Sequence, residues 1–252
     1  MLYNERIERI LQQLQLQGIV KISDLTELLG VSVDTVRRDL KTMEQNNLVR
    51  CVRGGACLPD SLTSISGFSG RQIVNEGLKR EAARKAAAYV KTGSVIALNS
   101  GTTNTILAQE LAVRSDKFTV ITNNMAAVQI LMQNPSIDLI AVGGMIDGVE
   151  KSTYGSVCEQ EFDRYYPDIA FLSINAVNYQ DGFTDFRFYE IPVIQILARR
   201  AGSVMAVMDS GKLGKRSKQK VLSFDKVDKL LMDDRVSGRL KEEYESRGLQ
   251  IE

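Results

Sequence analysis

The first fifty residues carry apolar positions with the spacing of amphipathic helices. Between positions 7 and 14, isoleucine and leucine recur at intervals of three and four residues, and Gly18 follows as a helix breaker. A second helix is expected over 24–29, with Ser23 as its N-cap and Gly30 at its C-terminal end. The inward face of this helix is expected to hold Leu25, Leu28 and Leu29.

A third helix is expected after the turn at 31–32, and its outward side is basic. Its N-cap is expected to be Ser32, and its buried edge is expected to hold Val33, Val36, Leu40 and Met43. At about 100° per residue, Arg38 points away from that edge. Two helices joined by a short turn form a helix-turn-helix unit, whose second helix enters the DNA major groove. Long cations reach phosphates or guanine edges there, and short polar groups read bases. The expected DNA-facing residues of this helix are Ser32, Asp34, Thr35, Arg37, Arg38 and Lys41.

Two short β-prone arms around Gly54 and Gly55 predict a hairpin after the third helix. This hairpin would make the unit a winged helix, with Arg50 and Arg53 where a wing meets the DNA backbone or the minor groove. Residues 37–53 hold five basic and two acidic side chains, a local basic surplus. The alternative is a three-helix packing unit with a solvated charged face. The order of helices, tight turn and hairpin favours DNA binding.

The rest of the chain predicts a doubly wound, mostly parallel α/β domain. Residues 59–70 are rich in serine, glycine and proline, as is typical of a connecting segment. Beyond them, strand-length apolar runs alternate with helical patterns, which indicates a parallel sheet. Strands are expected at 94–98, 118–122, 137–142, 168–174, 203–209 and 228–232, and helices at 75–91, 103–113, 124–133, 155–163 and 188–201. The expected domains are a winged helix-turn-helix (1–58), a linker (59–74) and an effector-sensing α/β domain (75–252).

Polar turns follow several of the expected strands, where ligands bind in sheets of this kind. The turn at 99–104 reads NSGTTN, and its backbone N–H groups and hydroxyls at a helix N-terminus suit a phosphate. Lys212 would supply a counter-charge, and Arg187 would contact an acidic or hydroxylated ligand tail. The alternatives are a capped turn without a ligand and, for Arg187, a loop cation between packed aromatics. The expected effector-binding residues are Asn99, Ser100, Gly101, Thr102, Thr103, Thr122, Asn123, Gly143, Gly144, Asn175, Arg187 and Lys212.

Composition narrows the chemistry. The net charge is +1, from 32 basic and 31 acidic residues, so a basic surface has to be local. The chain has no histidine, which excludes Ser-His-Asp triads, Cys-His dyads and zinc sites built on imidazole. Its three cysteines form no C-x-x-C pair and are expected to be free thiols. We expect no metal, no cofactor and no membrane span, and a cytoplasmic location, because the N-terminus is charged and no apolar run approaches 18 residues.

The stretch at 31–56, VSVDTVRRDLKTMEQNNLVRCVRGGA, resembles the signature of the DeoR family of bacterial transcriptional regulators. Matching segments continue through nearly the whole chain, at 93–103, 122–123, 143–144, 168–172, 181–185 and 209–214. This resemblance implies DNA binding by a winged helix. It also implies a sensor domain with a fold similar to ribose-5-phosphate isomerase that responds to phosphorylated sugars or related intermediates.

The chain departs from the family pattern at several positions. Arg53 replaces the usual His of the wing, and Asn47 replaces a Gly. Asn99 and Asn175 each stand where the family usually has Asp, and the family's Lys of the following helix falls near Ile194 or Gln195. An isomerase needs a titratable carboxylate near the sugar and groups that stabilise an enediolate. Because asparagine cannot accept a proton in this role, the sequence favours a site that senses its ligand without transforming it.

We therefore expect a transcriptional repressor of a carbohydrate-catabolism operon, controlled by a phosphorylated sugar or a related metabolite. Its partners would be double-stranded operator DNA, the effector, and further copies of the chain as a dimer or a tetramer. One alternative is a sugar-phosphate isomerase-like enzyme with an appended helical domain. Another is an interaction protein whose helix-turn-helix no longer binds DNA.

Overall fold

The computed structural model describes residues 2–17, 19–46, 48–52, 54–58 and 68–252. The chain divides into two compact units, residues 1–76 and residues 77–252. One hydrophobic cluster fills the first unit, and two clusters fill the second.

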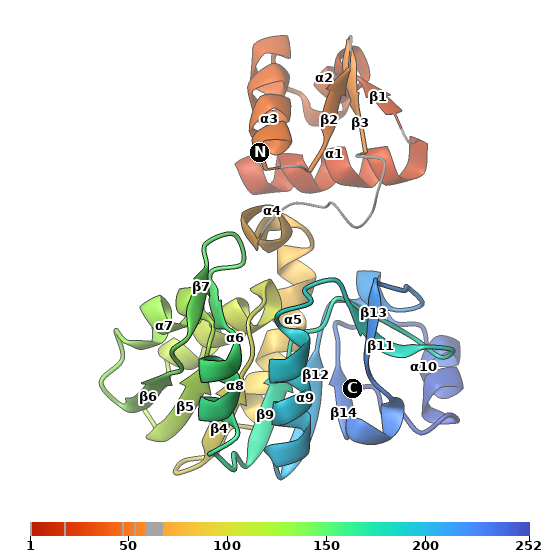
Figure 1. Ribbon diagram of the computed structural model, residues 1–252. Helices are drawn as coiled ribbons and strands as arrows, with labels where there is room; N and C mark the ends of the chain where they lie inside the picture. The colour runs from red at the N-terminus through yellow and green to blue at the C-terminus, as the bar shows by residue number, and fades with distance from the viewer. Residues whose placement is uncertain (1, 18, 47, 53, 59–67) are drawn as a thin grey trace. The chain divides into compact units, whose positions relative to one another are not determined.

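The N-terminal unit is a winged helix-turn-helix (Figure 1). Its elements in chain order are α1 (Tyr3–Gln17), β1 (Ile19–Lys21), α2 (Ile22–Leu29), α3 (Val33–Gln45), β2 (Arg50–Val52), β3 (Gly55–Cys57) and α4 (Phe68–Ile73). The three strands form an antiparallel sheet in the order β1-β3-β2. The β2–β3 hairpin is the wing, and β2 contacts α3. Buried apolar side chains from the first three helices, such as Ile10, Leu25 and Leu40, pack together as the core.

The capping predictions hold at two positions and fail at one. Gly30 ends α2 in the left-handed conformation, with φ of 63°. The Ser32 hydroxyl accepts a hydrogen bond from the Thr35 amide at 3.3 Å and begins α3. The prediction for Ser23 is wrong, because α2 begins at Ile22 and the Ser23 hydroxyl donates to the Asp24 carboxylate.

Two apolar residues assigned to the inner faces of these helices are instead exposed. Leu28 is 40% exposed and Val33 is 42% exposed. On α2 the inner stripe is formed by Leu25 and Leu29, four residues apart, so Leu28 lies at its margin. On α3 the inner row includes Asp39, which is 4% exposed, in addition to apolar residues.

The stretch expected as a linker contains the short helix α4. Helix α4 contacts α1, so residues 68–73 belong to the first compact unit. Residues 59–67, as well as Asn47 and Arg53, lie outside the described residues.

The C-terminal unit is built on a six-stranded, entirely parallel sheet in the order β14-β12-β9-β4-β5-β6. Its strands are β4 (Val95–Leu98), β5 (Phe118–Thr122), β6 (Ile137–Ala141), β9 (Ile169–Leu172), β12 (Ser203–Val207) and β14 (Lys229–Leu231). The helices are α5 (Glu76–Ala88), α6 (Thr102–Ala112), α7 (Met125–Leu131), α8 (Ser156–Phe162), α9 (Ile191–Arg200) and α10 (Gly238–Glu245). The first five of these helices, and all six strands, match the elements predicted from the sequence to within a few residues.

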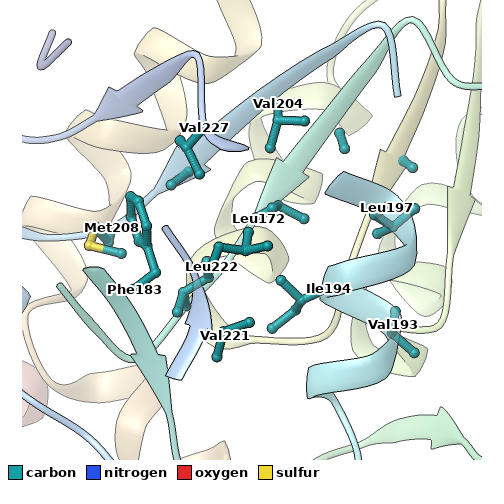
Figure 2. Packing of buried hydrophobic residues seen from close by; sticks show 14 of the residues in the cluster. Leu172, Phe183, Val193, Ile194, Leu197, Val204, Met208, Val221, Leu222 and Val227 are labelled. Carbon is teal, nitrogen blue, oxygen red and sulfur yellow. The ribbon is translucent and has the colours of Figure 1, made fainter. Parts of the chain in front are cut away.

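Alternate side chains of each strand bury themselves on opposite faces of the sheet. In β9, Phe171 packs with α5, α6 and α7 on one face, whereas Leu172 packs with α8 and α9 on the other. Figure 2 shows the second of these clusters, where Leu172 and Val204 of the sheet meet Ile194 and Leu197 of α9. Helices on both faces make the sheet doubly wound, as expected.

In the C-terminal unit, two groups of antiparallel strands and helix α10 were not predicted. Strands β7 (Met145–Asp147) and β8 (Ser152–Tyr154) form a hairpin, and β10 (Ala176–Asn178), β11 (Gly182–Asp185) and β13 (Gln219–Leu222) form a small sheet. These strands are only three or four residues long, so their alternation is too short to read from the sequence. Within the part of the chain that the structure describes, no helix is both long and apolar enough to cross a bilayer.

Candidate functional site

The outward side of α3 presents the residues expected to face DNA. Arg37, Arg38 and Lys41 are exposed, as are Ser32 and Asp34, while Thr35 is partly buried beside the N-cap. The Arg38 Nε donates to the Asp34 carbonyl oxygen at 3.4 Å. Arg37 forms a solvent-exposed ion pair with Asp34, at 3.6 Å. Two long cations and Lys41 therefore project from the helix that a helix-turn-helix places in the major groove.

The opposite side of α3 is held against α1 by a buried ion pair. The Asp39 carboxylate accepts hydrogen bonds from the Arg6 guanidinium, at 2.6 Å from Nε and 2.9 Å from Nη2. This two-point contact fixes the rotation of α3 about its own axis. It thereby keeps Arg38 and Lys41 directed outward.

The wing supplies a further expected contact. Arg50 is exposed in β2, and its strand pairs with β3 through Cys57 opposite Arg50. Arg53, at the tip of the predicted hairpin, lies outside the described residues.

In the C-terminal unit, the turn after β4 is joined to the end of β9 by Asn99. Its Oδ1 accepts the Ser173 amide at 2.7 Å, and its Nδ2 donates to the Ser173 carbonyl oxygen at 3.2 Å. Asn104 Nδ2 donates to the same Oδ1 at 3.0 Å. Only an amide can accept and donate in this way, since an ionised Asp has no hydrogen to give to the Ser173 carbonyl. Asn99 therefore links two strand ends.

A buried carboxylate, Glu190, lies against the start of α6. Its Oε1 accepts the Ser100 amide at 2.7 Å, and its Oε2 accepts Asn123 Nδ2 at 3.1 Å. Burial raises the pKa of Glu190 to about 7, although the charge of Arg187 and these hydrogen bonds oppose the shift. The Ser100 N–H, which was expected to hold a phosphate, therefore already donates to a carboxylate.

Arg187 is held by a second carboxylate. Its Nε and Nη2 bind the two oxygens of Asp185 at 3.0 and 2.7 Å. Its Nη1 donates to the Ser100 carbonyl, and its Nη2 donates to the Ser173 carbonyl, both at 2.8 Å. Burial alone would raise the pKa of Asp185, but Arg187 outweighs it and holds that pKa below its usual range.

This network shows how Arg187 is held, and its contact with a ligand stays a prediction. Its guanidinium is paired with Asp185 and joins the ends of β4, β9 and β11. Of the aromatics beside it in the sequence, Phe188 and Tyr189 are 58% and 65% exposed.

A cavity of about 240 Å³ opens between the β7–β8 hairpin and residues 186–190. Tyr154 of the hairpin and Tyr189 contact each other here, with ring centroids 4.6 Å apart. Three carboxylates, Asp147, Glu150 and Glu190, line the cavity together with Arg187. Of the twelve residues expected to bind an effector, Arg187 alone lies in the wall of this cavity.

The remaining expected effector residues lie around the strand ends. Thr122 Oγ1 donates to the Leu98 carbonyl at 2.7 Å, and the Asn175 amide donates to Asp185 at 3.0 Å. Lys212 Nζ donates to the Ile174 carbonyl at 3.1 Å. Gly143 and Gly144 are exposed and follow the end of β6.

The cradle itself, residues 99–104, is tightly enclosed. Gly101, with φ of 144°, lies so close to the Ser173 side chain that any Cβ there would collide with it. Thr102 is 4% exposed, and Thr103 is fully buried. Several buried polar atoms around the cradle have no hydrogen-bond partner among the described residues: Ser100 Oγ, Thr103 Oγ1, Asn104 Oδ1 and Asn123 Oδ1. Such atoms are costly unless a partner satisfies them, which suits a ligand rich in oxygen.

Sequence reasoning missed Glu190 and the role of Asp185. Glu190 stands just before the helix signal Ile191-Pro192, where nothing in the sequence distinguishes it from a first-turn acid. Its presence removes the argument that Asn99 and Asn175 leave the site without a titratable carboxylate. The carboxyl group of Glu190, with a pKa of about 7, lies beside the turn at 99–104.

Comparisons with known proteins agree on the organisation of the chain. Residues 6–62 match the DeoR-like helix-turn-helix domain, and residues 74–234 match the DeoR C terminal sensor domain. The HTH-type transcriptional regulator GolR of Listeria innocua is 29% identical over 247 residues, 98% of this chain and 97% of GolR. A putative aga operon transcriptional repressor of Escherichia coli O157:H7 is 28% identical over 250 residues, covering 98% and 93%. Ribose 5-phosphate isomerase A of Methanocaldococcus jannaschii superimposes with a TM-score of 0.42 over 55% of each chain, at 24% identity.

Proposed function

Because the chain belongs to the DeoR family of transcriptional regulators, we propose that it represses a carbohydrate-catabolism operon until a phosphorylated sugar or related metabolite binds its sensor domain. It is a DNA-binding transcriptional regulator by virtue of that family, whose two domains together span most of its length. The name of one relative, a putative aga operon repressor, supports repression of an operon.

The observation that carries the DNA-binding proposal is the division of α3 into two sides. Arg37, Arg38 and Lys41 are exposed, whereas Asp39 is buried in an ion pair with α1. In this arrangement Arg38 contacts a base edge or a phosphate, and Arg37 and Lys41 contact the DNA backbone. Ser32, Asp34 and Thr35 near the helix start would face bases, and Arg50 and Arg53 of the wing would contact the flanking duplex.

The effector site is proposed at the carboxyl ends of β4, β5 and β9, with the adjoining cavity as its entrance. Ser100, Thr102 and Thr103 lie at the N-terminus of α6, where backbone N–H groups favour an anion. Partnerless buried oxygens of Ser100 and Thr103 support an oxygen-rich ligand. Asn99, Gly101, Thr122, Asn123, Gly143, Gly144, Asn175, Arg187 and Lys212 are proposed to shape this site or to hold its walls.

Regulation would couple this site to the DNA-binding surface through the assembly of subunits. A two-fold symmetric operator needs at least two winged helices at a fixed spacing, so the chain would act as a dimer or a tetramer. An effector that prefers an arrangement with the wrong spacing would release the operator. Such a protein would act in the cytoplasm, without a metal or a cofactor.

An isomerase-like activity is the second candidate, and Glu190 is the observation that favours it. A buried carboxyl with a pKa of about 7 is suited to proton transfer at neutral pH. Against it, both Glu190 oxygens accept hydrogen bonds from Ser100 and Asn123, an arrangement that also serves to close the cradle. Turnover of an aldose or ketose phosphate by the purified protein would favour the enzyme.

The test of the proposed function is a binding titration of the full chain on the DNA upstream of its own gene. Affinity should fall steeply with salt, because binding releases counterions from several phosphates. Sugar phosphates are then added one by one to the complex. Release of the DNA by one of them supports the proposal, whereas salt-insensitive binding or no binding contradicts it.

A further inference from the structure

Glu190 lies between the cavity and the anion cradle. Its side chain forms part of the cavity wall, and its carboxylate accepts the Ser100 amide at the start of α6. An incoming anion that used the same N–H would meet this carboxylate first. The cradle has a second indication of a ligand, because the fully buried oxygens Ser100 Oγ and Thr103 Oγ1 have no hydrogen-bond partner in the part of the chain that the structure describes.

We propose that Glu190 is the specificity-determining gate of the effector site: its ionised carboxylate competes with an anionic ligand for the donors of Ser100 and Asn123, so that an anion binds only together with a proton. This inference rests on the proposed effector site. When it is protonated, the Glu190 carboxyl has an O–H that can donate a hydrogen bond to the anionic ligand.

The surroundings of Glu190 favour its losing charge when an anion arrives. The ion pair that Arg187 forms is with Asp185 rather than with Glu190, although the charge of Arg187 opposes the rise in the pKa of Glu190. Arg187 is already engaged, because its Nε and Nη2 bind Asp185 and its Nη1 binds the Ser100 carbonyl oxygen. A second negative charge placed beside ionised Glu190 would therefore be poorly compensated in this buried site.

Among the groups around Glu190 whose pKa is shifted, Glu190 is the one that titrates near neutral pH. Arg187 stays charged, and its partner Asp185 has a lowered pKa and stays ionised. Cys158 of α8 has a pKa raised to about 12 by burial and stays neutral. The cavity wall adds Asp147 and Glu150 of the β7–β8 hairpin, with Tyr154 and Tyr189, whereas the Ser100 amide donates to Glu190. Burial raises the pKa of Glu190 itself to about 7.

Sulfate is the probe for this gate, because it stays a dianion throughout the range in which Glu190 titrates. The full-length protein is titrated calorimetrically with sulfate between about pH 6 and pH 8.5 at constant ionic strength. Wild-type affinity should fall about tenfold per pH unit above pH 7, since only the neutral form binds. Glu190→Gln should bind about tenfold more tightly than wild type at pH 8 and lose the pH dependence.

Two further measurements decide the outcome. Repeating the wild-type titration in buffers of different ionisation enthalpy should show uptake of about one proton per sulfate at pH 8. Glu150→Gln, which removes a carboxylate from the same cavity but not from the cradle, should keep the wild-type slope. Equal slopes in wild type and Glu190→Gln, absence of proton uptake, or no sulfate binding by either protein would overturn the gate. The proposed function fails separately, if no sugar phosphate releases the operator.

Discussion

Asp39, in the middle of the basic helix α3, points inward and is bound at both of its oxygens by Arg6 of α1. The two side chains are 14% and 6% exposed for Arg6 and Asp39, respectively. The acidic residue of the sequence Arg37-Arg38-Asp39 thus positions the helix, while its two basic neighbours remain available to DNA. Within one turn of α3, exposed residues that can bind DNA are therefore followed by a buried residue that holds the helix in place.

Replacing Asp39 by Ala should destabilise the N-terminal unit. The change removes a two-point ion pair from the largely buried Arg6 guanidinium, which typically costs about 3 kcal/mol. Urea unfolding followed by circular dichroism measures the loss. Asp34→Ala, at a carboxylate that is 79% exposed on the same helix, should change the free energy of unfolding by less than about 0.5 kcal/mol. Equal stability of the two variants would contradict the anchoring role.

The fold was predictable where the period of the apolar pattern was long enough to read. The six parallel strands and five helices of the sensor domain are buried on defined faces, so each leaves a run of apolar residues in the sequence. Two of the wrong assignments, Leu28 and Val33, have the spacing of inward-facing residues but are 40% and 42% exposed. Spacing along a helix fixes an angle and says nothing about where the neighbouring elements end.

Replacing Arg38 by Ala should weaken binding to the operator. If Arg38 contacts a guanine, preference at one base position should relax by about 1–3 kcal/mol; if it contacts a phosphate, the salt dependence should decrease by about one unit of slope. Fluorescence anisotropy with the native site and single-base variants separates these results. Arg164→Ala removes an exposed arginine from the sensor domain and is the matched control. Unchanged affinity and slope for Arg38→Ala would remove this residue from the interface.

The candidate site was predictable only in part, because its polar residues are defined by contacts between distant segments. Asn99 and Ser100 could be placed at a strand end, since parallel strands bring their carboxyl ends to one edge. Glu190 follows Ser100 by ninety positions, and its contact with the Ser100 amide depends on the conformation of the turn at 186–190. No local pattern encodes such a contact.

Replacing Asn99 by Asp should destabilise the sensor domain. The new carboxylate would face the Ser173 carbonyl oxygen, to which Asn99 now donates a hydrogen bond. Leaving this buried acceptor without its donor costs about 1–3 kcal/mol. The loss should grow as pH rises above the usual range of a carboxyl group, because the charged form is the one that repels the carbonyl. Thermal unfolding at several pH values measures it.

Gln129→Glu, an equivalent change at an exposed position of α7, should leave the melting temperature nearly constant at every pH. If Asn99→Asp melts like wild type, the amide of Asn99 is not needed to join β4 to β9.

The titration of Glu190 should appear in stability as well as in ligand binding. Burial raises the pKa of this carboxyl from its ordinary 4.5 to about 7 in the folded protein. Between these two values the folded state holds a proton that the unfolded state has released, so the free energy of unfolding falls as pH rises through this window. The full loss is about 3 kcal/mol, at 1.36 kcal/mol for each pKa unit. It is complete above pH 7 and absent below about pH 4.5.

Other carboxylates titrate in the same range, so the informative quantity is the difference between wild type and Glu190→Gln. Urea unfolding at intervals from pH 4.5 to pH 8 should show the variant gaining up to about 3 kcal/mol relative to wild type, since Gln carries no proton to lose. Glu150→Gln controls for loss of a carboxylate from the same cavity and should follow the wild-type curve. A difference that stays constant with pH would mean that Glu190 is ionised at no cost in the folded protein, and that the carboxylate is stabilised by its hydrogen bonds to Ser100 and Asn123.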